Sequence, residues 1–390
     1  VGFLWWLGLK ASVLNVTGLR KPNRSSKLYC SKPIPLCSCA WRLFSRRLSA
    51  KPPCRSKERN FRVDKCSVAI TGCGAALPEH RMTNFDLEKI VETSDEWILS
   101  RTGIRERRIL EEGLSNVDLS ERASRVALRN AGLKPEQLEL ILVATVTPDY
   151  PLPATACNLQ ARLGAFQAAA MDLSAGCSGF IYALTVADHF IRAGTYRNAL
   201  VIGVEILSRI IDWEDRSTCV LFGDGAGAAV LQPVEGDRGL ISFELGADGR
   251  GLESLYIPAG GVALPTSAGT VQQRLHYVKM NGPEIFKFAV RVVEETLERL
   301  LAQGRCQPSD LDHLFLHQAN LRIIESIRKR LRLPREKVPV NIDRYGNMSS
   351  ATIPITLYEE AAAGRLKEGD LLAAVAFGAG LTWGGILMRW

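Results

Sequence analysis

The sequence has few residues in the patterns that bind metals or form disulfide frameworks. Among its 390 residues there are only five histidines, of which His313 and His317 are the one close pair. The ten cysteines are scattered, and no two stand in a Cys-x-x-Cys spacing. Zinc sites and disulfide scaffolds depend on such spacings. We therefore expect no metal site, and the cysteine usage indicates a reducing compartment.

Nucleotide-binding loops are missing as well. No Gly-x-Gly-x-x-Gly follows an expected strand, and no Gly-x-x-x-x-Gly-Lys-[Ser/Thr] occurs anywhere. The glycine-rich residues 223–227 have the wrong spacing for a dinucleotide loop. These absences argue against a dinucleotide-binding or P-loop protein.

Acidic side chains are almost absent from the first 62 residues, which hold 14 Lys and Arg but one acid, Glu58. The apolar residues 1–16, broken by Lys10, are too few to predict a membrane span. Because acid-poor, Arg- and Ser-rich leaders are typical of transit peptides, we predict a targeting leader over residues 1–65 and a location in the plastid stroma. The alternative is upstream sequence without a role, which would place the protein in a bacterial cytoplasm.

The rest of the chain holds 35 Lys and Arg against 40 Asp and Glu, so the net charge of +8 comes from the leader. A mildly acidic body gives no support for nucleic acid binding. We therefore expect no nucleic acid partner.

Unbroken apolar runs alternate with helical patterns through this body. Such runs predict strands buried on both faces of a sheet, and the 3.6-residue periodicity predicts helices between them. The alternation predicts an α/β protein with a largely parallel sheet. The expected strands cover residues 68–74, 140–144, 199–204, 314–316 and 371–377, and the expected helices cover residues 119–131, 179–193, 284–303, 321–331 and 353–363.

Similar segments recur in the same order along the body. Three such repeated segments indicate a duplicated domain. We therefore predict two α/β halves, residues 66–235 and 236–390, with a cleft between them. The paired segments are residues 131–143 and 303–316, the Ala-Gly helix ends at 193–194 and 363–364, and residues 222–227 and 377–380.

Cys177 is the first candidate for chemistry. It lies in Ala175-Gly-Cys-Ser-Gly-Phe180, between a strand-like run and a helix. The dipole and unpaired N–H groups of a helix N-terminus stabilise a thiolate, and the neighbouring glycines permit a tight turn. A buried structural cysteine is the alternative interpretation.

His317 and Asn347 lie in two further loops. His317 follows a buried strand, at the sheet edge where ligands bind in such folds, although an isolated histidine there could equally be structural. Asn347 lies in a Gly-Asn turn before a helix and by itself could be an N-cap. In the repeat, its loop corresponds to the Cys177 loop. Together the three residues would form a thiolate nucleophile with two hydrogen-bond donors.

With these segments the sequence resembles β-ketoacyl-ACP synthase III, the initiating condensing enzyme of type II fatty acid synthesis, from about Cys66 to Trp390. The resemblance implies a thiolase-like fold of two duplicated halves in five αβαβα layers, and a homodimer. The matching segments are residues 93–98, 101–107, 175–180, 222–229, 317–320, 345–347 and 377–384.

The resemblance also implies a mechanism. Cys177 takes an acyl group, acetyl being the expected one, from acyl-CoA, while the backbone N–H groups of Cys177 and Ala379 hold the oxyanion. Malonyl-ACP then loses carbon dioxide while His317 and Asn347 donate hydrogen bonds to its thioester carbonyl. The enolate attacks the acyl group and gives 3-oxoacyl-ACP. No cofactor is expected, because CoA and the ACP phosphopantetheine enter as substrates.

Further residues carry over by position in the family motifs. Trp97 and Arg216 match positions that enclose the CoA adenine, Arg101 matches one that meets its phosphates, and Asn320 matches one that lines the pantetheine tunnel. Phe377 matches an aromatic residue beside the nucleophile. The candidate docking face for the acidic carrier protein consists of Lys287, Arg322, Lys329 and Arg330.

The sequence departs from the family pattern at three positions. Met348 replaces the usual Thr after Asn347, and Gly176 replaces the usual Ala before Cys177. Leu152 stands where a Phe from the partner subunit often closes the acyl pocket. A smaller residue there leaves the choice of primer open.

Other functions for the same fold remain open. A thiolase-fold acyltransferase, or a ketosynthase of secondary metabolism, would use the same acyl-cysteine. A silent partner subunit would usually lack the nucleophile, whereas Cys177 is present.

Overall fold

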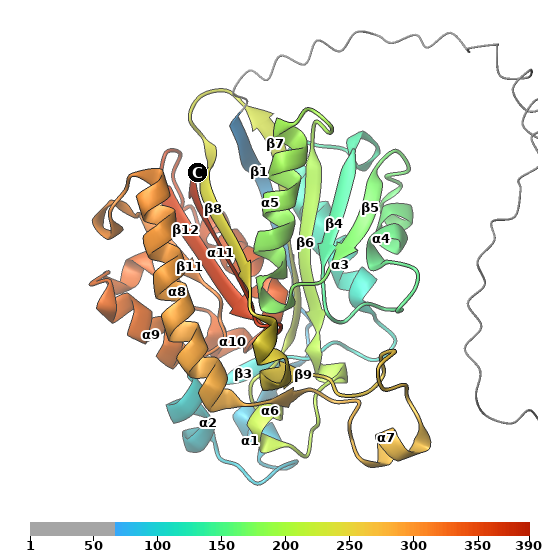
Figure 1. Cartoon of the computed structure of the whole chain (residues 1–390). Helices are drawn as coiled ribbons and strands as arrows, with labels where there is room; N and C mark the ends of the chain where they lie inside the picture. Colours follow the sequence, from blue (N-terminus) through green and yellow to red (C-terminus); the bar gives the residue numbers. More distant parts are fainter. Residues whose placement is uncertain (1–66) are drawn as a thin grey trace, which may run out of the picture. The chain divides into compact units, whose positions relative to one another are not determined.

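The computed structural model describes residues 67–390, so the leader predicted over residues 1–65 lies outside the described residues. The described chain forms two larger sheets (Figure 1). The strand orders are β1-β7-β6-β4-β5 and β11-β12-β13-β8, and β2–β3 and β9–β10 form small pairs. The bounds are β1 Ser67–Ala76, β2 Arg81–Thr83, β3 Glu106–Arg108, β4 Leu140–Ala144, β5 Ala169–Leu173, β6 Ala199–Ile206, β7 Asp224–Val234, β8 Gly239–Ala247, β9 Leu255–Tyr256, β10 Lys279–Met280, β11 His313–Leu316, β12 Leu371–Gly378 and β13 Thr382–Arg389.

Helices cover both faces of each larger sheet and give five layers, αβαβα. Helices α3 and α4 pack on the outer face of the five-stranded sheet, α5 and α11 lie between the sheets, and α8 and α9 pack on the outer face of the four-stranded sheet (Figure 1). This confirms the thiolase-like architecture. The helices are α1 Asn84–Leu87, α2 Asp95–Thr102, α3 Asn116–Asn130, α4 Thr155–Leu163, α5 Gly179–Arg192, α6 Arg216–Cys219, α7 Ala268–Gln272, α8 Gly282–Gly304, α9 Leu321–Arg330, α10 Ile342–Tyr345 and α11 Thr352–Ala362.

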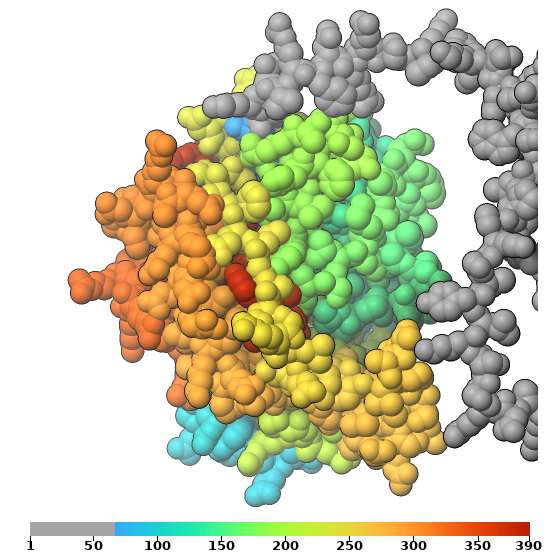
Figure 2. Space-filling model, in the orientation of Figure 1, coloured from blue at the N-terminus to red at the C-terminus, as the bar shows by residue number. Residues whose placement is uncertain are grey.

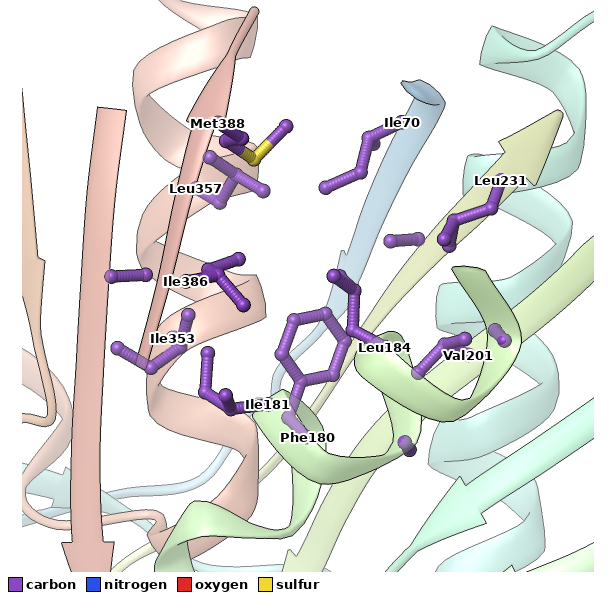
Figure 3. Close-up of a cluster of buried hydrophobic side chains, with 14 of the residues drawn as sticks. Ile70, Phe180, Ile181, Leu184, Val201, Leu231, Ile353, Leu357, Ile386 and Met388 are labelled. Atoms are coloured by element: carbon purple, nitrogen blue, oxygen red, sulfur yellow. The ribbon is translucent and has the colours of Figure 1, made fainter. Parts of the chain in front are cut away.

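The central layer holds the two sheets together. Phe180 and Leu184 of α5 and Ile353 of α11 are buried in one cluster with Val201 of β6 and Ile386 of β13 (Figure 3). Burial of each such side chain contributes roughly 1.5–3 kcal/mol. Because α5 begins at Gly179, just after the turn that holds Cys177, this packing fixes the position of the nucleophile candidate.

The expectation of a largely parallel sheet was wrong. The pairs β4–β5, β4–β6 and β11–β12 are parallel, whereas β1–β7, β6–β7, β12–β13 and β13–β8 are antiparallel. The antiparallel pairs all involve β7, β8 or β13, and these three strands were not expected from the sequence. β7 contains two glycines and three alanines, a composition that predicts a loop, and β13 follows β12 through a short turn.

The boundary expected between residues 235 and 236 falls between β7 and β8. All strands of the five-stranded sheet precede it, and all strands of the four-stranded sheet follow it. In the space-filling view the first half (green) and the second half (orange) lie side by side, with atoms of the C-terminal segment (red) in the seam (Figure 2). Over residues 67–390 no helix is long and apolar enough to cross a membrane.

Candidate active site

One pocket receives residues from both halves of the body. Cys177, His317 and Asn347 all line it, although they come from three separate loops. Each is buried, with 8%, 2% and 7% of its surface exposed, respectively. The rest of the lining is mostly apolar and comprises Leu221, Phe222, Leu255, Met280, Gly282, Ile285, Phe286, Ala319, Asn320, Ile323, Phe377 and Gly378.

Cys177 lies in a 3₁₀ turn, Gly176–Ser178, between β5 and α5. This turn contacts the end of β12 backbone to backbone, since a Cβ on Gly378 would lie 2.5 Å from the amide nitrogen of Cys177. The Ser178 hydroxyl lies 2.9 Å from the Thr382 hydroxyl, and Thr382 donates a 2.8 Å hydrogen bond to the Ala175 carbonyl. The nucleophile candidate is thus held by both halves.

The groups around the Cys177 thiol shift its pKa in opposite directions. Burial raises the pKa of the thiol to about 12, a hydrogen bond with Ser349 lowers it, and the Glu205 carboxylate raises it. The backbone N–H groups of Cys177 and Ala379 also lower this pKa, which places both groups beside the sulfur. The helix N-terminus expected to stabilise a thiolate is therefore outweighed by burial in the free protein.

His317 follows β11 directly, and its backbone N–H donates a 3.0 Å hydrogen bond to the Val375 carbonyl. Its Nδ1 atom lies 2.7 Å from the Thr352 hydroxyl, and its ring meets that of Phe377 edge-on with centroids 5.4 Å apart. Burial lowers the pKa of His317 to about 3. The imidazole is therefore neutral at physiological pH. His313, at the start of β11, does not line the pocket.

Asn347 is fixed through its backbone and through one end of its side chain. Its N–H donates to the Leu221 carbonyl at 2.8 Å, and its carbonyl accepts from the Gly223 N–H at 3.0 Å. Its Oδ1 atom accepts from the Ser349 N–H at 2.8 Å. Because Oδ1 is engaged, the Nδ2 amide group is the end that can donate to a ligand.

Two departures from the family pattern have physical explanations. Gly176 has a φ of +54°, a left-handed conformation that glycine adopts without strain, and a Cβ there would lie 2.9 Å from the Ala379 amide nitrogen. Met348 is fully buried, and its sulfur fills the space that the missing side chain of Gly225 leaves. Both replacements fit the observed loops.

Comparison with known proteins points to one family. Family models described as "3-Oxoacyl-[acyl-carrier-protein (ACP)] synthase III" and its "C terminal" part match residues 171–249 and 301–390. The chain is 57% identical to "Beta-ketoacyl-[acyl-carrier-protein] synthase III" of Symbiobacterium thermophilum. The matched region of 323 residues covers 83% of this chain and 98% of that protein. The chain belongs to the β-ketoacyl-ACP synthase III family.

Solved structures agree with this assignment. The 3-oxoacyl-[acyl-carrier-protein] synthase III from Aquifex aeolicus VF5 is 47% identical with a TM-score of 0.77, over 83% of this chain and 100% of that one. The priming β-ketosynthase from the R1128 polyketide biosynthetic pathway is 33% identical with the same TM-score, over 83% of this chain and 96% of that one. The protein is a condensing enzyme of the acyltransferase class that initiates fatty acid synthesis.

The residues expected to bind CoA form one cluster in this synthase. The guanidinium groups of Arg101 and Arg216 lie 4.6 Å and 4.7 Å from the centroid of the Trp97 ring. Asn320 joins this cluster to the pocket, because its Nδ2 donates to the Arg101 carbonyl at 3.0 Å and its Oδ1 caps α9 through the Arg322 N–H. Both guanidinium groups therefore lie against the Trp97 ring.

The four basic residues of the expected carrier face are exposed, but they differ in their partners. Arg322 lies over the Phe286 ring, which itself lines the Cys177 pocket. Arg330 forms an ion pair with Glu294. Its charge is therefore partly neutralised, whereas Arg322 stands beside the pocket.

Leu152 lies away from the Cys177 pocket of its own chain. It is 86% exposed in the loop before α4 and is not among the residues that line that pocket. Leu152 therefore does not line the Cys177 pocket of its own chain, and its role in a partner's pocket stays a prediction.

The sequence interpretation missed three residues that support the triad. Ser349 and Thr352 contact Cys177 and His317, respectively, and the buried Glu205 hydrogen-bonds to Ser349. The available signal was Glu205 itself, the one charged residue in the apolar run of β6. Buried carboxylates in such strands usually have an assigned partner or role.

Proposed function

We propose that the synthase transfers an acetyl group from acetyl-CoA to Cys177 and condenses it with malonyl-ACP, giving 3-oxoacyl-ACP, CoA and carbon dioxide. The observation that carries this proposal is the convergence of Cys177, His317 and Asn347 in one buried pocket. A nucleophile with two neutral donors suits decarboxylative carbon–carbon bond formation, in which loss of carbon dioxide supplies the carbanion.

Acyl transfer to Cys177 is the first half-reaction. The thiolate attacks the thioester carbonyl carbon, and the oxyanion forms beside the backbone N–H groups of Cys177 and Ala379, which already border the sulfur. Donors positioned before the reaction stabilise such charge without reorganisation.

Decarboxylation is the second half-reaction. In the free protein the Thr352 hydroxyl donates to the Ser349 carbonyl, so the His317 Nδ1–H donates to Thr352 and Nε2 carries the lone pair. Donation to the malonyl thioester carbonyl uses the other tautomer, in which the Thr352 hydroxyl turns to donate to Nδ1 and the proton resides on Nε2. The Asn347 Nδ2 group donates to the same oxygen. Because both donors are neutral, the enolate gains charge stabilisation while neither donor titrates near pH 7. This scheme requires no metal or redox cofactor.

The substrates approach along two surfaces. Trp97, Arg101 and Arg216 would hold the CoA nucleotide by stacking and phosphate contacts, after Arg216 moves off the Trp97 ring. The acidic carrier protein would dock on Lys287, Arg322 and Lys329, with Arg330 contributing less because of Glu294.

A homodimer completes the acyl pocket in this proposal. β5 is an edge strand of the five-stranded sheet, and Phe166, Leu152 and Met171 are exposed at 71%, 86% and 39% around it. Pairing of β5 with a partner's β5 would cover this edge. Leu152 would then reach the partner's pocket, where a side chain smaller than Phe admits longer or branched primers.

The compartment depends on the leader. The relatives reported above come from bacteria, which favours the bacterial alternative over the plastid stroma. The plastid location stays a prediction from residues 1–65, and expression of the full chain fused to a fluorescent protein in plant cells tests it.

A ketosynthase of secondary metabolism is the second candidate. The likeness to a priming ketosynthase of a polyketide pathway favours this alternative, and it would use the same acyl-cysteine. Incubation of the protein from residue 66 onward with a panel of acyl-CoAs, followed by intact mass spectrometry, separates these uses by the primer that loads. Cys177→Ala should abolish loading, and stoichiometric loading of that variant would overturn the nucleophile assignment.

A further inference from the structure

Glu205 is a fully buried carboxylate for which the mechanism above has no use. It lies near the end of β6, a strand whose eight residues are all buried. Its Oε2 atom accepts hydrogen bonds from the Thr147 hydroxyl at 2.8 Å and from the Val146 N–H at 3.1 Å. Its Oε1 atom accepts from the hydroxyls of Ser349 at 3.1 Å and Ser350 at 2.9 Å. These partners come from both halves of the fold.

Ser349 connects this carboxylate to the nucleophile. The same hydroxyl that donates to Glu205 lies beside the Cys177 thiol, whose pKa it lowers. A hydroxyl can accept one proton while it donates another. Cys177, Ser349 and Glu205 therefore lie in a row, with Ser349 between the thiol and the carboxylate.

The thiol proton needs an acceptor before Cys177 can attack a thioester. His317 is a poor acceptor, because burial lowers its pKa to about 3. Burial raises the pKa of Glu205 to about 7, although its hydrogen bonds oppose this shift. The carboxylate is thus poised to gain or lose a proton at physiological pH.

We propose that Glu205 is a positioning residue that receives the Cys177 proton through Ser349 and returns it at the end of the reaction. This inference rests on the proposed acyl-cysteine function. On loading, the thiol proton passes to Ser349 Oγ as the Ser349 proton passes to Glu205 Oε1. The sulfur lone pair then forms the new C–S bond, the bond to CoA breaks with its electron pair on the CoA sulfur, and solvent protonates the CoA thiolate.

Condensation reverses the transfer. When the enolate carbon attacks the acyl group, the bond from that group to Cys177 breaks, and the electron pair stays on the sulfur. The proton held on Glu205 returns to this sulfur through Ser349. The enzyme ends in its starting state, and the one proton consumed overall comes from solvent and appears on CoA.

The surroundings of Glu205 contain few other titratable groups. Cys177 on the 3₁₀ turn before α5 is the titratable side chain coupled to it. His317, after β11, lies beyond Ser349 through Thr352. Asp224 on the neighbouring strand β7 is directed elsewhere, since its carboxylate accepts from Ser208 and from the Leu110 N–H.

The test measures how the reactivity of Cys177 depends on pH. Single-turnover loading from acetyl-CoA and alkylation by iodoacetamide are both followed by intact mass spectrometry between about pH 5 and 10. Wild type should become more reactive through an inflection near the pKa of Glu205, because only the ionised carboxylate accepts the proton. Glu205→Gln should lose this inflection and react about 10²-fold more slowly near pH 7.5, within the range for a positioned proton acceptor.

Two variants make the result specific. Ser349→Ala keeps the carboxylate but breaks the path, so it should lose the same inflection; it also serves if Glu205→Gln does not fold. Asp224→Asn removes another buried carboxylate and should keep the inflection. An unchanged inflection in Glu205→Gln or Ser349→Ala would overturn the proposal. If no acyl-CoA loads Cys177, the proposed function is contradicted. Alkylation needs no acyl-CoA, so it still tests the proton path in that case.

Discussion

At the residue scale, burial dominates the chemistry of the pocket. It raises the pKa of the Cys177 thiol and lowers the pKa of His317, so both groups are neutral in the free enzyme. A neutral pair suits a reaction in two stages. The thiol must be activated only when acyl-CoA is present, and the imidazole must donate a hydrogen bond without giving up its proton.

Asn347→Ala should separate the two stages. Loading of Cys177 should persist, because Asn347 does not contact the thiol in our account, whereas malonyl-ACP decarboxylation should fall about 10²–10³-fold, as on removal of one oxyanion donor. Rapid-quench assays of each half-reaction measure this. Equal losses in both would show that Asn347 only maintains the loop.

His317→Gln should change how stability depends on pH. The folded pKa of His317, about 3, lies below its ordinary value of 6.5, so the unfolded chain binds a proton between these values that the folded chain does not. The stability associated with the neutral ring is present above pH 6.5 and is lost as pH falls. At pH 5 this loss is roughly 2 kcal/mol.

Urea unfolding of both proteins at pH 5 and pH 8 measures this effect. Wild type should lose roughly 2 kcal/mol more than His317→Gln between the two conditions. Because Glu205 is common to both proteins, its own titration cancels in the difference. Parallel pH dependences would contradict the description of His317 as a buried neutral group.

At the element scale, the pocket depends on close contact between the turn before α5 and the end of β12. Cys177 comes from the first half, whereas Gly378 and Ala379 come from the second, and their backbones touch. The packing of α5 and α11 between the sheets holds these two segments in register. The proposed oxyanion donors therefore depend on the contact between the two halves.

Gly378→Ala should disrupt this contact. The new Cβ would lie 2.5 Å from the Cys177 amide nitrogen and 2.9 Å from its Cβ, so one backbone must shift, at about 1–3 kcal/mol. We expect loading to fall by at least about 10²-fold through the displaced oxyanion donor. Gly261→Ala is the control, because a Cβ there meets nothing within 4 Å. Equal loading by wild type and Gly378→Ala would refute the oxyanion assignment.

The sequence predicted most elements but not how all strands pair. Five buried strands and five long helices were expected within a few residues of their observed bounds, because apolar runs and 3.6-residue periodicity report burial directly. β7 was missed because its Gly and Ala residues leave room for Ile355 and Met348, a contact that local patterns do not contain. Ser349 and Thr352 were missed for the same reason, since their partners lie on distant loops.

At the scale of the whole molecule, two sheets of unequal size enclose a central helical layer, and the pocket forms where the halves meet. Strand β5 is one of the edge strands of the two larger sheets, and among the described residues no strand pairs with its outer side. An exposed edge with apolar neighbours favours association. The proposed dimer covers this edge and brings the Leu152 of each chain to the pocket of the other.

Met171→Arg should weaken this dimer. Met171 lies in β5 and is 39% exposed, so the chain should fold with little loss while two Arg charges meet across the proposed interface. Sedimentation analysis should then show monomers with reduced loading. Val262→Arg, at a position 99% exposed on another loop, is the control. A monomeric wild type, or an unchanged dimer in Met171→Arg, would contradict the interface.

The central claim is that Cys177 carries an acyl group which malonyl-ACP removes by condensation. The most direct measurement loads the protein, made from residue 66 onward, with acetyl-CoA and follows its intact mass before and after a chase with malonyl-ACP. We predict one acetyl group on Cys177 that disappears as 3-oxoacyl-ACP forms. An acetyl group that stays on Cys177 in the presence of malonyl-ACP would contradict the condensing reaction and indicate an acyltransferase with a different acceptor.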